Sequence, residues 1–317
     1  MLGAIPSRED ENLLVGYDTA DDAAVYRLND DTCLIQTVDF FTPIVDDPED
    51  FGEITAANSL SDVYAMGGRP LTALSLVCYP YKTWPIHILQ AIMAGGARKV
   101  LESGALVVGG HSVADDEIKF GYAITGTVAA DAFWRNNTPE PGDVLVLTKP
   151  LGTGTLTTAI KKDLLGAEYL EEPVAEMKRL NACAAELAQN LEVHAATDIT
   201  GFGLMGHLYE MLKPRGYGAK ICCEALPVFP GVWEAIKARA FTGAHTSNRE
   251  YVCDYEIPET TGLETYGQIL FDPQTSGGLM LALPKQEATS YLSGLNDAGH
   301  RAAIIGEVTA EAVIRCE

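Results

Sequence analysis

The stretch Ala57–Pro70, with the sequence ANSLSDVYAMGGRP, contains the second half of a predicted helix and the signal that ends it. Gly67, Gly68 and Pro70 stop a helix that we expect over residues 50–66, because glycine adopts the left-handed cap conformation and proline cannot continue a helix. Asn58 and Asp62 are four residues apart and share one helix face. A solvated face would need more polar neighbours, so these two oxygen-bearing side chains predict a site for a hard cation. The apolar or small residues of the helix share another face: Ile54, Ala57, Leu60, Ser61 and Tyr64.

Strand and helix patterns extend outward from this helix in both directions. A hairpin is predicted before it, from apolar runs at residues 23–28 and 33–39 around a polar turn at residues 29–31. Hairpins and long insertions interrupt the alternation of strands and helices, so the fold class is α+β and not a doubly wound sheet. The expected elements that follow are strands at 71–79, 105–108, 122–128, 144–148, 278–283 and 302–307, and helices at 86–103, about 173–190 and 203–213.

A polar stretch rich in Pro and Gly at residues 136–143 separates the two halves. Such segments are typical of domain boundaries. The sequence therefore predicts two domains, residues 1–137 and residues 138–317.

The composition excludes several classes of function. The net charge of −22 and a pI near 4.5 argue against a nucleic-acid partner, which requires clustered Lys and Arg. No run approaches the roughly 18–20 apolar residues of a membrane span, and the first 30 residues are acidic and do not resemble a signal peptide. The seven cysteines contain no C-x-x-C spacing. A cytoplasmic protein with reduced thiols is expected, with no membrane partner.

Four aspartate-bearing segments lie at the ends of apolar runs: Asp21-Asp22, Asp39, Asp62 and Asp198. Asp198 belongs to the sequence TDITGFG, in which glycines follow a strand and precede a helix. Carboxylates repel phosphates unless a divalent cation such as Mg²⁺ lies between them. The carboxylates of this acidic chain are therefore interpreted as a Mg²⁺–nucleotide site.

Two glycine-containing stretches add to this interpretation. Gly109-Gly110-His111-Ser112 is expected to be a turn after a strand, where backbone amides and the His and Ser side chains can bind an anion. The stretch Asp272–Gly278, DPQTSGG, contains more polar residues than a simple turn needs, although Pro and two glycines are also consistent with a rigid turn alone. Neither a Walker A sequence nor a G-x-G-x-x-G helix start is present, so the nucleotide must be held by metals and separate loops. The five other histidines are interpreted as packing or surface residues.

In combination, these motifs closely resemble the selenophosphate synthetase family, also called selenide, water dikinase, within the aminoimidazole ribonucleotide (AIR) synthetase-like superfamily. The resemblance extends from residue 12 to the C-terminus. The segments that carry it are Asp21–Val25, Thr37–Phe41, Ala57–Gly68, Gly109–Ser112, Thr148–Gly152, Thr197–Gly203 and Asp272–Gly278.

The resemblance implies a two-domain AIR synthetase-like fold and a homodimer in which the N-terminal domains pair their sheets. It implies ATP and Mg²⁺ as cofactors, and a reaction that converts ATP, selenide and water to selenophosphate, AMP and phosphate for selenocysteine and selenouridine synthesis. Asp22, Asp39, Asp62 and Asp198 match the metal-binding positions of the family, and Asp39 and Asp62 also match nucleotide contacts. Gly110, His111 and Ser112 match a segment that serves the nucleotide of the partner subunit. A protein that delivers selenium is a further possible partner.

One feature of the family is missing from this sequence. The family has a glycine-rich segment with a catalytic Cys or selenocysteine and a nearby Lys, which would lie upstream of Met1; the chain starts within the helix that precedes Asn12. We therefore expect no catalytic residue of that kind in this chain, and impaired selenophosphate formation. A selenocysteine codon read as a stop, a deliberate truncation and a non-catalytic paralogue are three explanations.

Two rival functions remain open from the sequence. Another ATP-dependent enzyme of the AIR synthetase-like superfamily would need a basic cluster for a ribosyl phosphate, and none is evident. A non-catalytic scaffold that binds ATP would explain the missing segment, but it would not need four retained aspartates.

Overall fold

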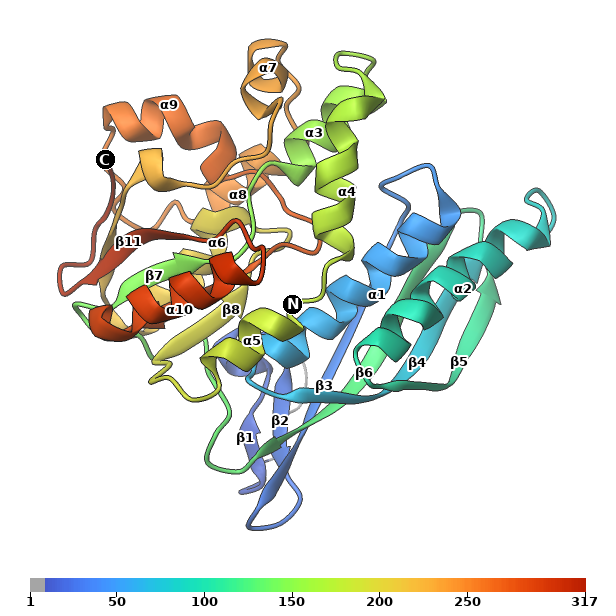
Figure 1. The fold of residues 1–317 in the computed structure, drawn as a ribbon, viewed down its shortest axis with the longest axis horizontal. Helices are drawn as coiled ribbons and strands as arrows, with labels where there is room; N and C mark the ends of the chain where they lie inside the picture. The colour runs from blue at the N-terminus through green and yellow to red at the C-terminus, as the bar shows by residue number, and fades with distance from the viewer. Residues whose placement is uncertain (1–8) are drawn as a thin grey trace.

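The computed structural model of the protein describes residues 9–317 and contains a six-stranded sheet in each half of the chain (Figure 1). The first sheet has the order β1-β2-β3-β6-β4-β5, and only the β4–β5 pair is parallel. The strands are β1 (Leu13–Val15), β2 (Ala24–Arg27), β3 (Thr32–Phe41), β4 (Arg69–Tyr79), β5 (Leu106–Ala114) and β6 (Lys119–Ala129). The predicted hairpin is the antiparallel pair β2–β3.

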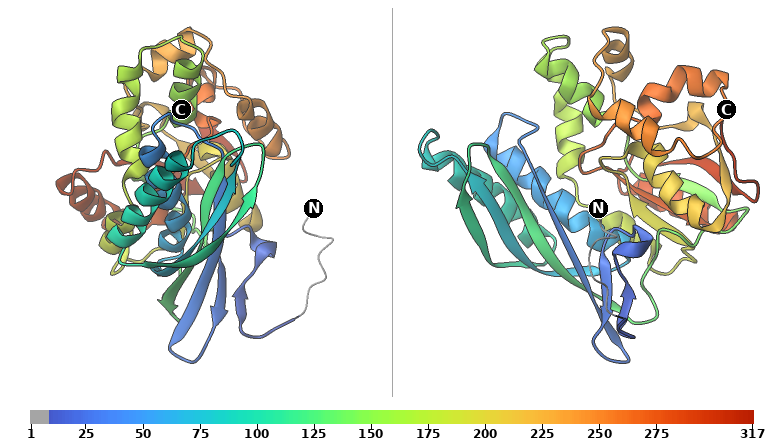
Figure 2. Two further views of the ribbon diagram at one scale, coloured as in Figure 1. Left: turned by 90° about the vertical axis from the view of Figure 1, so that its right-hand side faces the viewer. Right: turned by 180° about the vertical axis from the view of Figure 1, so that it is seen from behind.

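The helices α1 (Pro48–Ala65) and α2 (Ile86–Glu102) cover one face of this sheet (Figures 1 and 2). Residues alternate across a strand, so the residues of β3 and β4 that point away from α1 form a second, outer face. This outer face carries exposed apolar side chains, among them Val38 (56% exposed), Phe40 (50%) and Leu74 (46%).

Helix α1 confirms the prediction for residues 50–66. Its N-cap is Asp47, whose side chain accepts a hydrogen bond of 2.9 Å from the backbone nitrogen of Asp50, and Pro48 occupies the first turn. Nearly every residue from Phe51 to Ala65 is buried, because the sheet, α2 and the second half of the chain surround the helix. The polar side chains in the middle of α1 are therefore held inside the molecule, at the junction of the two halves: Thr55, Asn58, Ser59, Ser61 and Asp62.

The second sheet has the order β12-β9-β11-β7-β10-β8. Its strands are β7 (Val144–Leu147), β8 (Ala195–Asp198), β9 (Gly218–Ile221), β10 (Leu279–Leu283), β11 (Ala303–Thr309) and β12 (Ile314–Cys316). The helices of this half are α3 (Thr153–Lys161), α4 (Glu171–Lys178), α5 (Ala182–Ala188), α6 (Gly203–Leu212), α7 (Val232–Lys237), α8 (Ala244–Tyr251), α9 (Thr261–Leu270) and α10 (Lys285–Asp297). Short 3-10 helices occur at Tyr17–Thr19, Ala167–Leu170, Lys213–Arg215 and Cys223–Ala225.

The single helix expected at about residues 173–190 is in fact two helices, α4 and α5. The break occurs because Arg179 has extended backbone (φ −67°, ψ 125°), which ends α4. Both helices lie beside α1 (Figure 1). The break therefore places the residues between them at the junction of the two halves.

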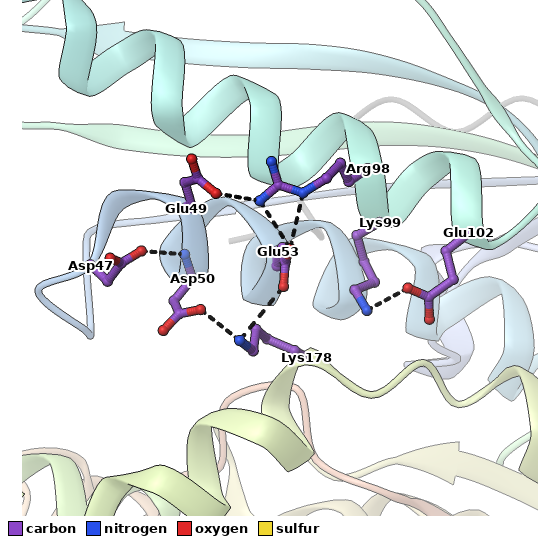
Figure 3. A network of polar contacts seen from close by, with 8 residues as sticks. All are labelled: Asp47, Glu49, Asp50, Glu53, Arg98, Lys99, Glu102 and Lys178. Atoms are coloured by element: carbon purple, nitrogen blue, oxygen red, sulfur yellow. Dashed lines mark hydrogen bonds and ion pairs between the residues drawn. The ribbon is translucent and has the colours of Figure 1, made fainter.

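A network of ion pairs surrounds the N-terminal part of α1 (Figure 3). Lys178, at the end of α4, contacts Asp50 at 2.6 Å and Glu53 at 3.7 Å, and so joins the second half of the chain to α1. Arg98 of α2 contacts Glu49 at 2.6 Å and Glu53 at 3.1 Å. Exposed ion pairs of this kind contribute little stability each, so packing and the buried hydrogen bonds described below hold the junction.

The helix expected around Met1 lies outside the residues that the structure describes. Within residues 9–317, no helix is both long enough and apolar enough to cross a membrane. The seven cysteines are free, and Cys33 is buried in β3.

Candidate functional site

Asp39 and Asp62 face each other across the contact between β3 and α1. Asp39 lies on the inner face of β3, and the side-chain nitrogen of Asn58 donates to its Oδ2 at 2.7 Å. Thr37, two residues earlier on the same face, donates to Oδ2 of Asp62. The predicted shared face of Asn58 and Asp62 therefore points at the end of β3, and both carboxylates are held by neighbouring side chains.

Asp22 and Asp198 complete the group from the two halves of the chain. Asp22 precedes β2, and its Oδ1 accepts a hydrogen bond of 2.8 Å from Thr197 of β8. Asp198 is the last residue of β8 and is 1% exposed. The four aspartates predicted from the sequence are thus brought together at the junction. Asp39 lies on β3, Asp62 on α1, Asp22 just before β2, and Asp198 at the end of β8 in the second sheet.

Burial and mutual repulsion make this group unfavourable without a cation. Burial raises the pKa of Asp39 and of Asp198 to about 6. The pKa of Asp62 is raised well above its usual value, first by burial and then by Asp198, Asp39 and Asp22. Burial and the charge of Asp198 raise the pKa of Asp22 in the same way. Bound cations would relieve both the repulsion and the loss of hydration.

The donor atoms fit Mg²⁺, because they are all oxygens. Oδ2 of Asp22 and Oδ2 of Asp198 are buried and have no hydrogen-bond partner. Unsatisfied buried oxygens of this kind are available to bind a metal ion. Over residues 9–317, no group of three or more Asp, Glu, His or Cys side chains is arranged to hold a metal ion. Mg²⁺ commonly uses only one or two carboxylates and takes its other ligands from water and phosphate, so pairs of these aspartates suffice.

The electrostatics predict how the stability of the ligand-free protein depends on pH. Asp39 and Asp198 have folded-state pKa values raised to about 6, above an unfolded value near 4, so their stabilising contribution is complete below about pH 4 and is lost as the pH rises through 6. We expect the free energy of unfolding to fall by roughly 2–5 kcal/mol from these groups between pH 4 and pH 8.

Urea unfolding at pH 5 and pH 8, with and without Mg²⁺, measures this effect. Mg²⁺ should restore stability at pH 8 and have little effect at pH 5, because it binds the ionised carboxylates. Titrating groups elsewhere in the protein change the free energy of unfolding equally with and without Mg²⁺, so the comparison isolates the effect of the aspartates. A Mg²⁺ effect that is the same at both pH values would contradict the prediction.

Gly109–Ser112 is not the turn that we predicted. These residues continue the edge strand β5, whose register follows β4 from Thr72 to Tyr79. A strand is favoured here because Gly110 packs directly on Ser75 of β4: an added Cβ atom would lie 2.1 Å from the Ser75 Oγ. The glycines are visible in the sequence, but the sequence does not show that β4 lies beside Gly110 and leaves no room for a side chain there.

The position of β5 separates Gly110, His111 and Ser112 from the aspartates of their own chain. Three strand spacings, about 14 Å, lie between β5 and β3 in the sheet. The three residues line a cavity of about 480 Å³ together with Leu89 and Met93 of α2. A nucleotide bound by these three residues would therefore occupy a different site from the one that Asp39 and Asp62 form in the same chain.

Two asparagines connect the halves directly beside the aspartates. Oδ1 of Asn58 accepts a hydrogen bond of 2.9 Å from the backbone nitrogen of Ser276. Asn181, in the break between α4 and α5, donates to Oγ of Ser61 at 2.8 Å and to the carbonyl of Gly277 at 2.9 Å. We call these two amide bridges the joint. Asn181 was not singled out from the sequence, and its only signal is its place in an interrupted helical pattern.

The stretch Asp272–Gly278 is more than a rigid turn. Asp272 is buried and accepts hydrogen bonds from the backbone nitrogen and the hydroxyl of Thr155, at 3.1 and 2.7 Å. Oε1 of Gln274 accepts from the backbone nitrogens of Gly152 and Thr153. These side chains satisfy the free amides at the start of α3, so that helix end does not offer them to a phosphate.

Lys149 and His207 are buried polar residues near the aspartates. The Lys149 ammonium donates to the carbonyls of Arg179 (2.7 Å) and Ser276 (3.0 Å), and burial lowers its pKa to about 7. Nε2 of His207 accepts a hydrogen bond of 3.1 Å from the backbone nitrogen of Thr200, in the loop after Asp198. Both residues fix backbone segments around the site, which agrees with the packing role predicted for His207.

Comparison with known proteins identifies relatives over nearly the whole chain. Residues 20–128 match the N-terminal domain, and residues 140–317 the C-terminal domain, of the AIR synthase related proteins. The chain is 44% identical to a selenide, water dikinase of Clostridium botulinum, over 97% of the chain and 89% of that protein. It is 46% identical to a selenide, water dikinase of Geobacter metallireducens, over 97% and 90%.

A solved structure shows the same fold at low sequence identity. The thiamine monophosphate kinase of Aquifex aeolicus, complexed with AMPPCP and TMP, superimposes with a TM-score of 0.67 and 18% identity, over 93% of this chain and 87% of that one. With the two family matches, this confirms the predicted α+β, AIR synthetase-like fold. The boundary at residues 137 and 138 remains a prediction.

Proposed function

Because the chain belongs to the selenide, water dikinase family of the AIR synthase related proteins, we propose that it forms selenophosphate, AMP and phosphate from ATP, selenide and water. One observation supports this most directly. Four aspartates with raised pKa values meet at the junction of the two halves. Asp62 and Asp198 are buried, Asp22 and Asp39 are half-buried, and the nearby Lys149 ammonium acts on Asp198. Such a site is suited to metal ions and a phosphate chain.

In this proposal, Asp22, Asp39, Asp62 and Asp198 hold Mg²⁺. The bound metal supplies positive charge that offsets the charge of the triphosphate and of the phosphoryl group in transfer. The protein supplies orientation: Asn58 fixes Asp39, Thr37 fixes Asp62 and Thr197 fixes Asp22. Asp39 and Asp62 would in addition contact the nucleotide through the metal.

A homodimer is the second part of the proposal. The outer face of the first sheet carries exposed apolar residues, and none of the helices described in residues 9–317 covers it (Figure 2). Two copies that pair these faces would bury it, as the resemblance to the family implies. Gly110, His111 and Ser112 at the edge of this sheet could then contact the nucleotide of the partner. A cytoplasmic location and a selenium-delivery protein remain predictions from the sequence.

Calorimetric titration tests the nucleotide site first. We expect the non-hydrolysable analogue AMPPNP to bind in the presence of Mg²⁺ and to bind at least a hundredfold more weakly when EDTA removes the metal, because the carboxylates then repel the phosphates. Mg²⁺-independent binding would overturn the proposed metal site.

Phosphorus NMR tests the reaction itself. The natural gene product, with its N-terminus established by mass spectrometry, should produce selenophosphate, AMP and phosphate in equal amounts from ATP and selenide. Omission of selenide is the control. Hydrolysis of ATP at the same rate without selenide, and with no selenophosphate signal, would refute the proposed substrate.

A further inference from the structure

Ser276 combines two unusual features. Its backbone φ is +48°, in the left-handed region that residues other than glycine seldom adopt. Its hydroxyl oxygen is buried and has no hydrogen-bond partner. A strained backbone and an unsatisfied buried group are both unfavourable, and they persist together mainly where a function requires them.

The backbone around Ser276 is fixed from both halves of the chain. Its nitrogen donates to Oδ1 of Asn58 at 2.9 Å, and its carbonyl accepts from Lys149 at 3.0 Å. The next carbonyl, that of Gly277, accepts from Asn181 at 2.9 Å. With three hydrogen bonds holding three successive peptide groups, the side chain of Ser276 has little freedom to find a partner within the protein.

The same asparagines connect Ser276 to the aspartates. Asn58 also donates to Asp39 at 2.7 Å. Asn181 also donates to Ser61, whose hydroxyl stabilises the charge of Asp198. The buried atoms without partners at this place include Oδ2 of Asp198, Oδ2 of Asp22 and Oδ1 of Asn181 in addition to the Ser276 hydroxyl. A chain of contacts links the residues that carry these atoms: Asp198 acts on Asp22, Ser61 on Asp198, and Asn181 binds both Ser61 and the residue after Ser276.

We propose that Ser276 is a ligand-binding residue of this site, and that its hydroxyl donates a hydrogen bond to an oxygen of the bound phosphate chain. The inference rests on the proposed function, because it assumes a phosphate ligand beside the aspartates. Among the unsatisfied atoms of the site, the carboxylate oxygens can only accept or bind metal, whereas the Ser276 hydroxyl can donate to an anion. It therefore contributes a contact that the metal cannot replace.

The change Ser276→Gly tests this role in a variant that we expect to fold. Glycine adopts a φ of +48° more readily than serine, so the ligand-free variant should unfold at an equal or higher temperature than the wild type. Because a hydrogen bond to a charged acceptor is lost, the affinity for Mg²⁺–AMPPNP should fall ten- to hundredfold. Ser276→Ala should show the same loss of affinity without the gain in unfolding temperature.

Asp163→Gly is the matched control. Asp163 is exposed and has a φ of +55°, so glycine should relieve the same kind of strain there, with no change in nucleotide affinity. If Ser276→Gly binds Mg²⁺–AMPPNP as tightly as the wild type, the proposed contact is wrong, whatever the unfolding temperature. If the wild type itself does not bind Mg²⁺–AMPPNP, the proposed function fails and this inference fails with it.

Discussion

The change Asp62→Asn is expected to abolish Mg²⁺-dependent nucleotide binding and at the same time to stabilise the ligand-free protein. Asp62 is 8% exposed and is repelled by Asp198, Asp39 and Asp22, so a neutral side chain of the same shape relieves an unfavourable charge. The amide oxygen of Asn can still accept from Thr37. We expect the free energy of unfolding at pH 8 to rise by about 1–3 kcal/mol, because replacing a buried, repelled charge with a neutral side chain commonly stabilises a protein by this amount.

The loss of binding should be larger than the gain in stability. A neutral amide is a much weaker Mg²⁺ ligand than a carboxylate, and without the metal the remaining aspartates repel the phosphates. Calorimetry should show affinity for Mg²⁺–AMPPNP reduced at least a hundredfold, about 2.7 kcal/mol or more. Unfolding in urea at pH 8 measures the opposite change in stability.

Asp46→Asn is the control for this experiment. Asp46 is exposed and precedes α1, and its replacement changes the net charge of the chain by the same amount. It should change neither binding nor stability appreciably, because surface substitutions usually stay within about 0.5 kcal/mol. Retained Mg²⁺-dependent binding in Asp62→Asn would exclude Asp62 as a metal ligand, and a less stable variant would show that its charge is compensated in the folded protein.

The change Leu74→Asp is expected to dissociate the proposed homodimer. Leu74 is 46% exposed on the outer face of β4, between Ala123 of β6 and Gly109 of β5 in the register of the sheet. A carboxylate at this position would be buried without a partner when two such faces pair. A two-fold interface contains the substitution twice, so we expect dimerisation weakened about a thousandfold or more.

Sedimentation velocity over a range of micromolar concentrations measures this change. Phe241→Asp is a matched control, since Phe241 is an equally exposed apolar residue (46%) in the second half of the chain. It should remain dimeric. A dimeric Leu74→Asp variant, or a monomeric wild type, would show that the outer face does not pair two copies.

The sequence predicted the elements whose pattern is local. The β2–β3 hairpin, α1, β4 and α2 appear where turn residues and apolar periodicity indicated them, because each depends on neighbours in the sequence. The four aspartates could be recognised because strand ends are places where loops carry polar side chains. Their assignment as metal ligands is still a prediction.

The errors concern contacts between distant segments. The strand at Gly109–Ser112 could not be predicted from its glycines, because it forms by pairing with β4, which lies more than 30 residues earlier in the sequence. The break at Arg179 and the roles of Asn181 and Ser276 depend on the docking of the two halves, through contacts between residues 120 and 218 positions apart in the sequence. No local preference of the chain indicates such contacts.

The joint also determines when the site first exists during synthesis. Asp39, Asn58 and Asp62 leave the ribosome early, but the backbone that Asn58 and Asn181 bind belongs to residues 276 and 277, close to the end of the chain. N-terminal domains generally fold first, so Asp39 and Asp62 of the proposed cation site are exposed to solvent until the second half has been made. A nascent chain cannot assemble this site until almost all of it has been translated, and a chain that stops before residue 276 cannot complete it.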